Sequence, residues 1–99
     1  MKIRLLSAAL DDLTVGRLFY EKQGEGLGEY FFDSLFSDID SLTLYSGVHP
    51  KIFGYYRMLS KRFPYAIYYK LVEEDSVAVV WRVLDLRGDP KKIRRSLTK

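Results

Sequence analysis

Hydrophobic positions change their spacing about halfway along the chain. In the first half, apolar side chains recur every three or four residues, which is the period of an amphipathic helix. In the second half they form short runs rich in Val, Ile and aromatic residues, separated by Pro, Gly or charged residues. The pattern predicts helices in the first half and strands in the second.

The first half begins with a short aliphatic strand, Lys2–Leu6, which precedes the first helix. Ser7 is the expected N-cap of that helix, and Asp11 and Asp12 lie near its positive N-terminal end. Two glycines interrupt the helical pattern shortly after Lys22. We therefore expect the helix to stop near that lysine.

A second helix carries the strongest periodic signal in the chain. Its apolar stripe, with steps of four, four, four and three, consists of Leu27, Phe31, Leu35, Ile39 and Leu42. The expected arrangement is an antiparallel hairpin of two helices packed against a sheet. A loop comes next, in which Pro50 keeps His49 out of a helical conformation.

Three strands are predicted in the second half: Lys51–Leu59, which Gly54 could divide in two, Phe63–Leu71 and Ser76–Asp85. Alternation along Phe63–Leu71 places Ala66, Tyr68 and Lys70 on one face. The last is nearly continuously apolar, which is typical of a central strand covered on both faces. Asp89 is the expected N-cap of a final helix, with Pro90 at its first position. The predicted fold class is α+β: an N-terminal strand, a two-helix antiparallel hairpin, three further antiparallel strands and a short C-terminal helix. The expected sheet is antiparallel throughout, with the helices packed mainly on one side.

The composition places further bounds on the protein. Its 99 residues are expected to form a single domain, 1–99. Aromatic residues make up 15% of the chain, more than a small core requires, so some rings are expected to face a partner. There is no cysteine and no apolar run near the ~20 residues of a membrane span. We expect a soluble, cytoplasmic protein that does not bind a membrane.

Charge is unevenly distributed along the sequence. Residues 1–50 carry a net charge of −4, whereas residues 51–99 carry +7, which together give the net +3 of the chain. The second half therefore supplies a basic face, and such faces attract phosphates or acidic proteins. An unevenly charged, solvated surface is the alternative interpretation.

Several kinds of chemistry have no support in the residues. One His and no Cys leave no zinc site, and Gly24–Gly28 lacks the strand and the spacing of a dinucleotide-binding loop. We therefore expect no cofactor and no metal. A hydrolytic triad would have to use His49, which as a lone His beside Pro is more typical of a structural or exposed residue.

The remaining candidates are basic and phenolic. Alternation along the last strand places Trp81, Val83, Asp85 and Arg87 on one side, so Asp85 and Arg87 are expected to project together. A cluster of cations on a sheet can hold a phosphodiester and stabilise charge that develops on phosphorus. The candidate binding residues are Arg62, Tyr68, Arg82 and Asp85, and the candidate catalytic residues of a metal-free ribonuclease are Arg57, Lys61 and Arg87. The competing interpretation is that these arginines form ordinary surface ion pairs.

Four stretches, taken in order, resemble the RelE/ParE superfamily of type II toxin–antitoxin (TA) modules. They are Ser7–Leu13, Tyr55–Arg57, Arg62–Tyr69 and Trp81–Pro90, and with the helical hairpin they cover nearly the full chain. The resemblance implies a growth-inhibiting toxin, as in plasmid stabilisation, that is held inactive by a cognate antitoxin. It also implies that the antitoxin wraps the toxin with an extended, partly helical segment.

The superfamily divides by target, and the residues bear on which branch this chain resembles. RelE-like members cut mRNA on the ribosome, whereas ParE-like members inhibit DNA gyrase. By position, Arg57 and Arg87 match two basic residues of the nuclease pattern. Ala66 replaces the basic residue expected after Tyr65, and Ile93 stands at the position of the terminal Tyr.

Another departure is that Asp85 stands where many members have His. The resemblance therefore favours a ParE-like toxin that acts by binding gyrase. A ribosome-dependent endoribonuclease, and a degenerate toxin that only binds its antitoxin, remain the alternatives.

Overall fold

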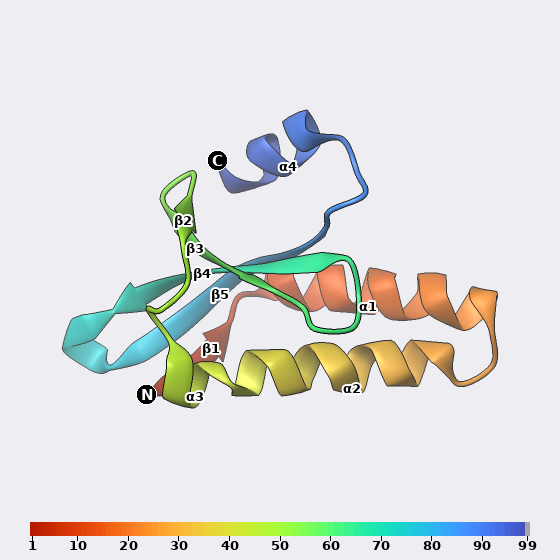
Figure 1. Ribbon diagram of the computed structural model, residues 1–99, viewed down its shortest axis with the longest axis horizontal. Coiled ribbons are helices and arrows are strands. Elements are labelled where there is room, and N and C mark those ends of the chain that lie inside the picture. Colours follow the sequence, from red (N-terminus) through yellow and green to blue (C-terminus); the bar gives the residue numbers. More distant parts are fainter. Residues whose placement is uncertain (99) are drawn as a thin grey trace.

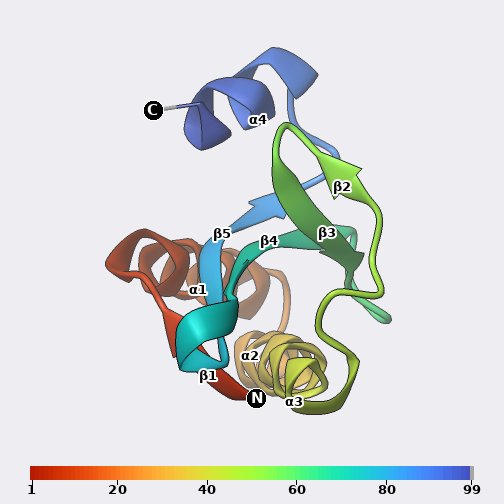
Figure 2. The ribbon, with the colours of Figure 1, turned by 90° about the vertical axis from the view of Figure 1, so that its left-hand side faces the viewer.

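The computed structural model describes residues 1–98 as a five-stranded sheet with helices on both faces (Figures 1 and 2). In chain order the elements are β1 (Lys2–Leu5), α1 (Ser7–Gln23), α2 (Leu27–Asp40), α3 (Leu42–Tyr45), β2 (Lys51–Ile52), β3 (Tyr55–Leu59), β4 (Tyr65–Val72), a 3₁₀ turn (Glu73–Asp75), β5 (Val77–Asp85) and α4 (Pro90–Leu97). The predicted α+β class is confirmed.

The strand order in the sheet is β1-β5-β4-β3-β2, so β5 has a neighbour on each side, as its apolar sequence predicted. The pairs β5–β4, β4–β3 and β3–β2 are antiparallel. The expectation of a wholly antiparallel sheet is wrong, because β1 pairs with β5 in parallel, with Lys2 opposite Val77 and Leu5 opposite Val80. A parallel pair needs a long connection, and the helical hairpin and three strands lie between β1 and β5 along the chain.

The predicted segment Lys51–Leu59 is divided at Phe53 and Gly54 into a hairpin of two strands, which agrees with the alternative of a break at Gly54. Phe53 and Gly54 form its two-residue turn, with φ angles of 54° and 83°. Positive φ at both central residues defines a type I′ turn, whose twist matches that of the flanking strands. The sheet therefore has one strand more than an undivided Lys51–Leu59 would give.

The ends of the first two helices differ in detail from the prediction. Leu6, not Ser7, is the N-cap of α1, and Ser7 is its first helical residue. α1 ends at Gln23, close to the predicted Lys22. α2 ends at Asp40 rather than Leu42, next to Ser41, whose hydroxyl donates to the Asp38 carbonyl at 2.6 Å. Such a bond competes with regular helix geometry, and the chain continues as the separate helix α3.

The face of the sheet that packs on α1 and α2 forms the larger core, called here the helix-side core (Figure 2). Its fully buried residues include Ala9, Leu13, Phe31, Leu35, Leu42, Ile67, Tyr69, Ala78 and Val80. Gly16 lets the helices approach one another, because a Cβ there would lie 2.5 Å from the Phe31 ring. The predicted hairpin of two helices on a sheet is confirmed.

A β-bulge changes the face to which β5 directs its side chains. Tyr68 pairs with Arg82 while Tyr69 pairs with Val80, which leaves Trp81 as the extra residue. Val80 and Val83 both belong to the helix-side core, whereas Trp81 packs on the opposite face. The prediction that Trp81 shares a face with Val83 is therefore wrong, because the bulge reverses the alternation.

The opposite face of the sheet packs on α4 and forms a smaller core, called here the α4-side core. Its buried residues are Tyr55, Ala66, Tyr68 and Leu97. The Tyr55 hydroxyl donates to the Leu97 carbonyl at 2.7 Å, which ties the end of α4 to β3. Asp89 is the N-cap of α4 and accepts from the Lys91 N–H at 2.9 Å, as predicted.

No helix within residues 1–98 combines the length and the apolar character that a membrane crossing requires.

Candidate functional site

Arg87 lies in the turn just after β5, where a carboxylate and a tyrosine hydroxyl fix its side chain. Its Nε donates to Asp85 Oδ1 at 3.0 Å, and its Nη2 donates to Asp85 Oδ2 at 2.8 Å. The same Nη2 also donates to the Tyr20 hydroxyl at 3.2 Å. With Tyr65, these residues form what we call the Arg87 corner. The expectation that Asp85 and Arg87 project together is confirmed by this two-point pair.

The aromatic residues under the corner come from α1, α2 and β4. Tyr20 stacks on Phe31 with ring centroids 5.0 Å apart, and Tyr65 meets Phe31 edge to face at 4.9 Å. The Arg87 guanidinium lies 5.7 Å from the ring centre of Phe19 and 5.9 Å from that of Tyr20. The rigid core thus supports a cation that remains half exposed at the surface.

The ionisation of the corner is set by these contacts. The hydrogen bond from Arg87 holds the pKa of Asp85 below its ordinary value, against the opposing effect of burial. The same bond raises the pKa of Arg87. Burial raises the pKa of Tyr65 to about 12, and the Asp85 carboxylate adds to that rise. At neutral pH the corner therefore holds an ionised pair and a protonated phenol.

Arg57 lies in β3 on the other face of the sheet. Its neighbours Tyr56 and Met58 pack on the helix-side core, and strand alternation turns Arg57 toward the α4 side. Burial raises the pKa of Tyr68, and the nearby Arg57 guanidinium partly opposes the rise. Arg57 and Arg87 therefore lie on opposite faces, and the expected single cluster of arginines is not formed.

Tyr68 is not available as a binding residue in this structure. Only 1% of it is exposed, because it packs among Tyr55, Ala66 and Leu97 under α4. The alternation of β4 predicted its face correctly, but the cover that the C-terminal helix provides was not predicted. The expectation that Tyr68 meets a partner is therefore corrected to a role in the α4-side core.

Lys61 and Arg62 lie together in the loop between β3 and β4, where both are exposed. The Lys61 N–H and the Ser60 hydroxyl both donate to Asp38 Oδ2, at 3.3 and 2.7 Å. Lys61 also borders a groove of about 320 Å³, which we call the Lys61 groove. Its other lining residues are Asp38, Ser41, Tyr45, Val48, His49, Met58 and Leu59.

His49 in the Lys61 groove has a structural partner. Its Nδ1 pairs with the Tyr69 hydroxyl, and the Gly47 N–H donates to the same hydroxyl at 2.8 Å. Burial lowers the pKa of His49. The ring thus holds the loop before β2 on the buried Tyr69, in agreement with the structural interpretation of this lone His.

Arg82 is held by Asp12 from α1, an interaction that the sequence did not reveal. The Asp12 carboxylate accepts from Arg82 Nε at 2.7 Å, from Arg82 Nη2 at 2.8 Å and from the Val83 N–H at 2.9 Å. The side-chain hydrogen bonding between Arg82 and Asp12 raises the pKa of Arg82. From the sequence, Asp12 was expected only to lie near the positive N-terminal end of the first helix, and no partner on a strand was predicted for it. The bulge at Trp81, which exposes the Val83 N–H to α1, carries no clear sequence signal.

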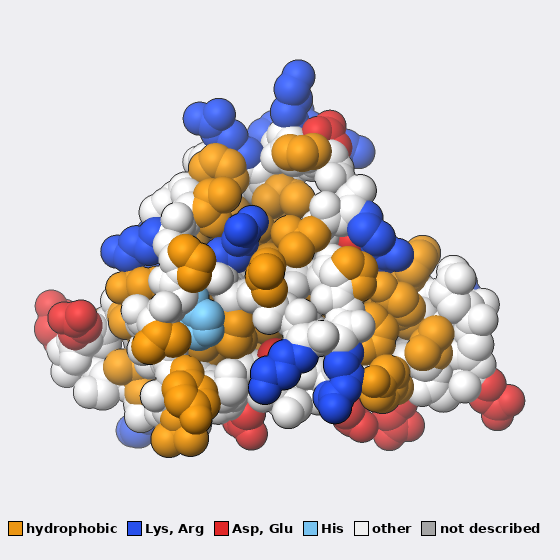
Figure 3. All heavy atoms as spheres, viewed as in Figure 1, with side chains coloured by type: hydrophobic (Ala, Val, Ile, Leu, Met, Phe, Trp, Pro, Cys, Tyr) orange, Lys and Arg blue, Asp and Glu red, His pale blue; other side chains and the backbone are white. Residues whose placement is uncertain are grey.

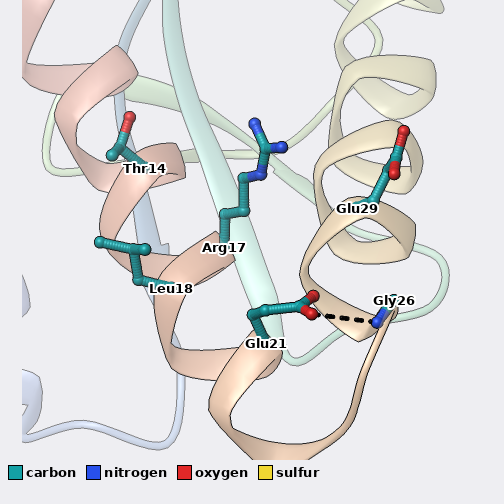
Figure 4. Close-up of a pocket in the computed structure, with 6 residues that line it drawn as sticks. All are labelled: Thr14, Arg17, Leu18, Glu21, Gly26 and Glu29. Carbon is teal, nitrogen blue, oxygen red and sulfur yellow. Dashed lines mark hydrogen bonds between the residues drawn. The ribbon is translucent and has the colours of Figure 1, made fainter.

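A second hollow of about 570 Å³ lies between α1 and α2 (Figure 4). Its lining residues are Thr14, Arg17, Leu18, Glu21, Gly26 and Glu29. The Glu21 carboxylate accepts from the N–H groups of Gly26 and Gly28, at 3.1 and 2.9 Å, and so caps the start of α2. That carboxylate has a structural role in the hairpin turn.

The chemistry that these residues support is anion binding more than proton transfer. A general base works best with a pKa near the working pH. In the Arg87 corner the Tyr65 phenol has a pKa of about 12, and the Asp85 carboxylate is bonded to a cation. Within residues 1–98, no three His, Asp or Glu side chains gather closely enough to hold a metal ion.

Comparison with solved structures finds the same fold in a chain of the chromosomal ParDE TA system from P. aeruginosa. The match has a TM-score of 0.71 and covers 87% of this chain and 96% of that chain, at 12% sequence identity. No model of a known protein family matches the sequence, and no curated protein matches it. The fold that the RelE/ParE resemblance implied is thereby confirmed.

Proposed function

We propose that this protein is the toxin of a type II TA system, that a cognate antitoxin neutralises it in the cytoplasm, and that it acts by binding and inhibiting DNA gyrase. The observation that carries the proposal is the fold shared with a chain of the ParDE TA system over 87% of this chain. The four RelE/ParE-like stretches support it independently, because they are recognisable in the sequence alone.

The separation of the candidate catalytic residues favours binding over RNA cleavage. Arg57 lies beside Tyr68 on the α4 side, Arg87 bonds to Asp85 and Tyr20, and Lys61 borders its own groove. The three share no contact partner among these interactions. Cleavage would need such groups around one phosphate together with a proton acceptor, which is worth roughly 10²–10⁴-fold in rate.

The Lys61 groove is the surface that we assign to the antitoxin. Tyr45, Val48 and Leu59 are 57%, 72% and 55% exposed, and they form an apolar rim beside the exposed cations Lys61 and Arg62. An amphipathic peptide with acidic residues matches this combination. The isolated chain should therefore be less soluble than its complex, and Val48→Asp should weaken antitoxin binding.

Induced expression in a bacterial host, followed by two assays, tests the proposal. We expect growth arrest, inhibition of supercoiling by purified gyrase, and unchanged mRNA ends. Absence of arrest would contradict toxicity and leave a protein that only binds an antitoxin. Codon-linked mRNA cleavage that disappears in Arg87→Ala, but persists in the control Arg17→Ala, would replace gyrase with the ribosome as target.

A further inference from the structure

Helix α4 carries a concentration of positive charge that no carboxylate within residues 1–98 neutralises. Four of its eight residues are exposed cations: Lys91, Lys92, Arg94 and Arg95. Within residues 1–98 the ion pairs are Arg82–Asp12 and Arg87–Asp85, so these four, here called the α4 cations, have no acidic partner. Figure 3 shows Lys and Arg side chains gathered around α4 at the top of the molecule.

Two of these charges lie where the helix itself disfavours them. Lys91 and Lys92 are in the first turn of α4, at the positive end of the helix dipole, whereas Arg94 and Arg95 lie in its last turn. Asp89 is the acidic residue nearest to them in sequence, and its Oδ1 accepts from the Lys91 N–H. A bound polyanion would relieve the repulsion in this first turn.

Two of the α4 cations, Lys92 and Arg95, border a hollow on the surface. It measures about 360 Å³ and is lined by Arg82, Lys92, Arg95 and Ser96. Lys92 and Arg95 are three residues apart on the helix, so their side chains are neighbours. Two hydrogen bonds to Asp12, from Nε and Nη2, fix the Arg82 side chain. The guanidinium has five N–H groups, so others remain that do not bond to this carboxylate and could donate to a phosphate.

We propose that this hollow and the α4 cations bind the phosphate backbone of a DNA duplex. The inference extends the proposed function, since gyrase acts on DNA and a toxin that contacts both would recognise the enzyme together with its substrate. It rests on charges and on the hollow rather than on the residues of the Arg87 corner. The binding is independent of base sequence, because it uses phosphate contacts alone.

The surroundings of the hollow distinguish a duplex from the other polyanions. An amphipathic acidic peptide needs exposed apolar anchors, and Tyr55 and Leu97 on this side are buried. Phe53 beside α4 is 43% exposed, but the Arg94 guanidinium lies over its ring, 5.6 Å from the ring centre. Single-stranded nucleic acid needs free rings for base stacking. The rings of Tyr55 and Trp81 are already covered by the Lys70 ammonium, which lies 4.6 and 5.1 Å from their centres. A rigid array of phosphates remains as the best match.

The test is the binding of a fluorescently labelled duplex of arbitrary sequence, about 20 base pairs long, to the purified chain, measured by anisotropy at several salt concentrations. We expect a Kd of about 10⁻⁶–10⁻⁴ M at physiological salt. The logarithm of the association constant falls as the logarithm of the salt concentration rises. Lys92→Gln/Arg95→Gln should make this slope less steep by about 2, since each lost phosphate contact removes about one unit. Both side chains are exposed, so this variant should keep the fold.

The matched control is Arg17→Gln/Lys22→Gln, which removes the same charge from exposed positions on α1. An equal loss of slope in the control, or no loss in the α4 variant, would overturn the proposal. So would tighter binding of a polyglutamate peptide or of the single strand than of the duplex. The assay contains no gyrase, so DNA binding without gyrase inhibition would refute only the proposed target. Inhibition without DNA binding would refute only this inference.

Discussion

The two faces of the sheet differ in the size of the core that they form and in the charge of the helices that cover them. The helix-side core joins two long helices to the sheet through interlocked rings, and Phe31 alone contacts Tyr20, Phe63 and Tyr65. The α4-side core is small, and the helix over it has eight residues, half of them cations. One face therefore supplies the stability of the protein, whereas the other combines a thin cover with a large positive charge. Substitutions on the two faces should separate these contributions.

The largest effect is expected from Phe31→Ala. Phe31 is fully buried and contacts rings from α1, β4 and the loop before it, so its loss should cost about 3–5 kcal/mol of unfolding free energy. Ile93→Ala in α4, where the side chain is only partly buried, should cost about 1 kcal/mol. Urea unfolding measures both. Equal costs would contradict the division between the two faces.

The next effect concerns the link between α1 and β5. Asp12→Ala removes the acceptor of three hydrogen bonds, two from Arg82 and one from the Val83 N–H. We expect a loss of about 2 kcal/mol, since a hydrogen bond to a charged group contributes about 1.5–3 kcal/mol and this pair is partly solvated. The control is Asp11→Ala, an exposed neighbour, which should change little.

A smaller effect is expected from Tyr55→Phe on the α4 side. The substitution removes only the hydroxyl that bonds to the Leu97 carbonyl, so it should cost about 1 kcal/mol. Amide hydrogen exchange should accelerate in α4 and remain unchanged in α2. Tyr45→Phe, at an exposed ring, provides the control. Faster exchange throughout the protein would show instead that α4 and the rest unfold as one unit.

The smallest effect is a pH dependence at the Arg87 corner. Arg87 lowers the pKa of Asp85, so this carboxylate stabilises the fold above its unfolded pKa of 3.8 and loses that contribution as pH falls through the lower folded value. Asp85→Asn should be slightly less stable than the parent at pH 7, and the difference should vanish in strong acid. Because the pair is partly exposed, a large difference at pH 7 would contradict this account.

Most of the fold could be predicted from periodicity and end signals. The stripe from Leu27 to Ile39 identified α2, the apolar run from Val77 identified the central strand, and Asp89-Pro90 identified the start of α4. These signals are local, since each depends on a few neighbouring residues and one buried face. The pairing of Asp85 with Arg87 is local in the same sense, and it was predicted too.

The features that the sequence did not reveal depend on contacts between distant segments. The bulge at Trp81 reverses the alternation of β5, and its Val83 N–H is satisfied by Asp12, about 70 positions earlier in the chain. Tyr68 alternates as predicted, yet its burial depends on where α4 docks. Strand alternation turns Arg57 toward α4, whereas Arg87 bonds to Tyr20 from α1 on the helix side. Residue spacing along the sequence could therefore not reveal whether the two arginines meet.

The pairing of β1 with β5 also bears on how such a protein is made. β1 is the first strand along the chain and β5 the last, yet the two are neighbours, and β5 joins β1 to β4. During synthesis α1 and α2 therefore emerge long before the strand that completes the sheet beneath them. A nascent chain that lacks β5 can pair β2, β3 and β4, but it has no strand that joins them to β1. The sheet beneath α1 and α2 is therefore complete only once β5 has been made.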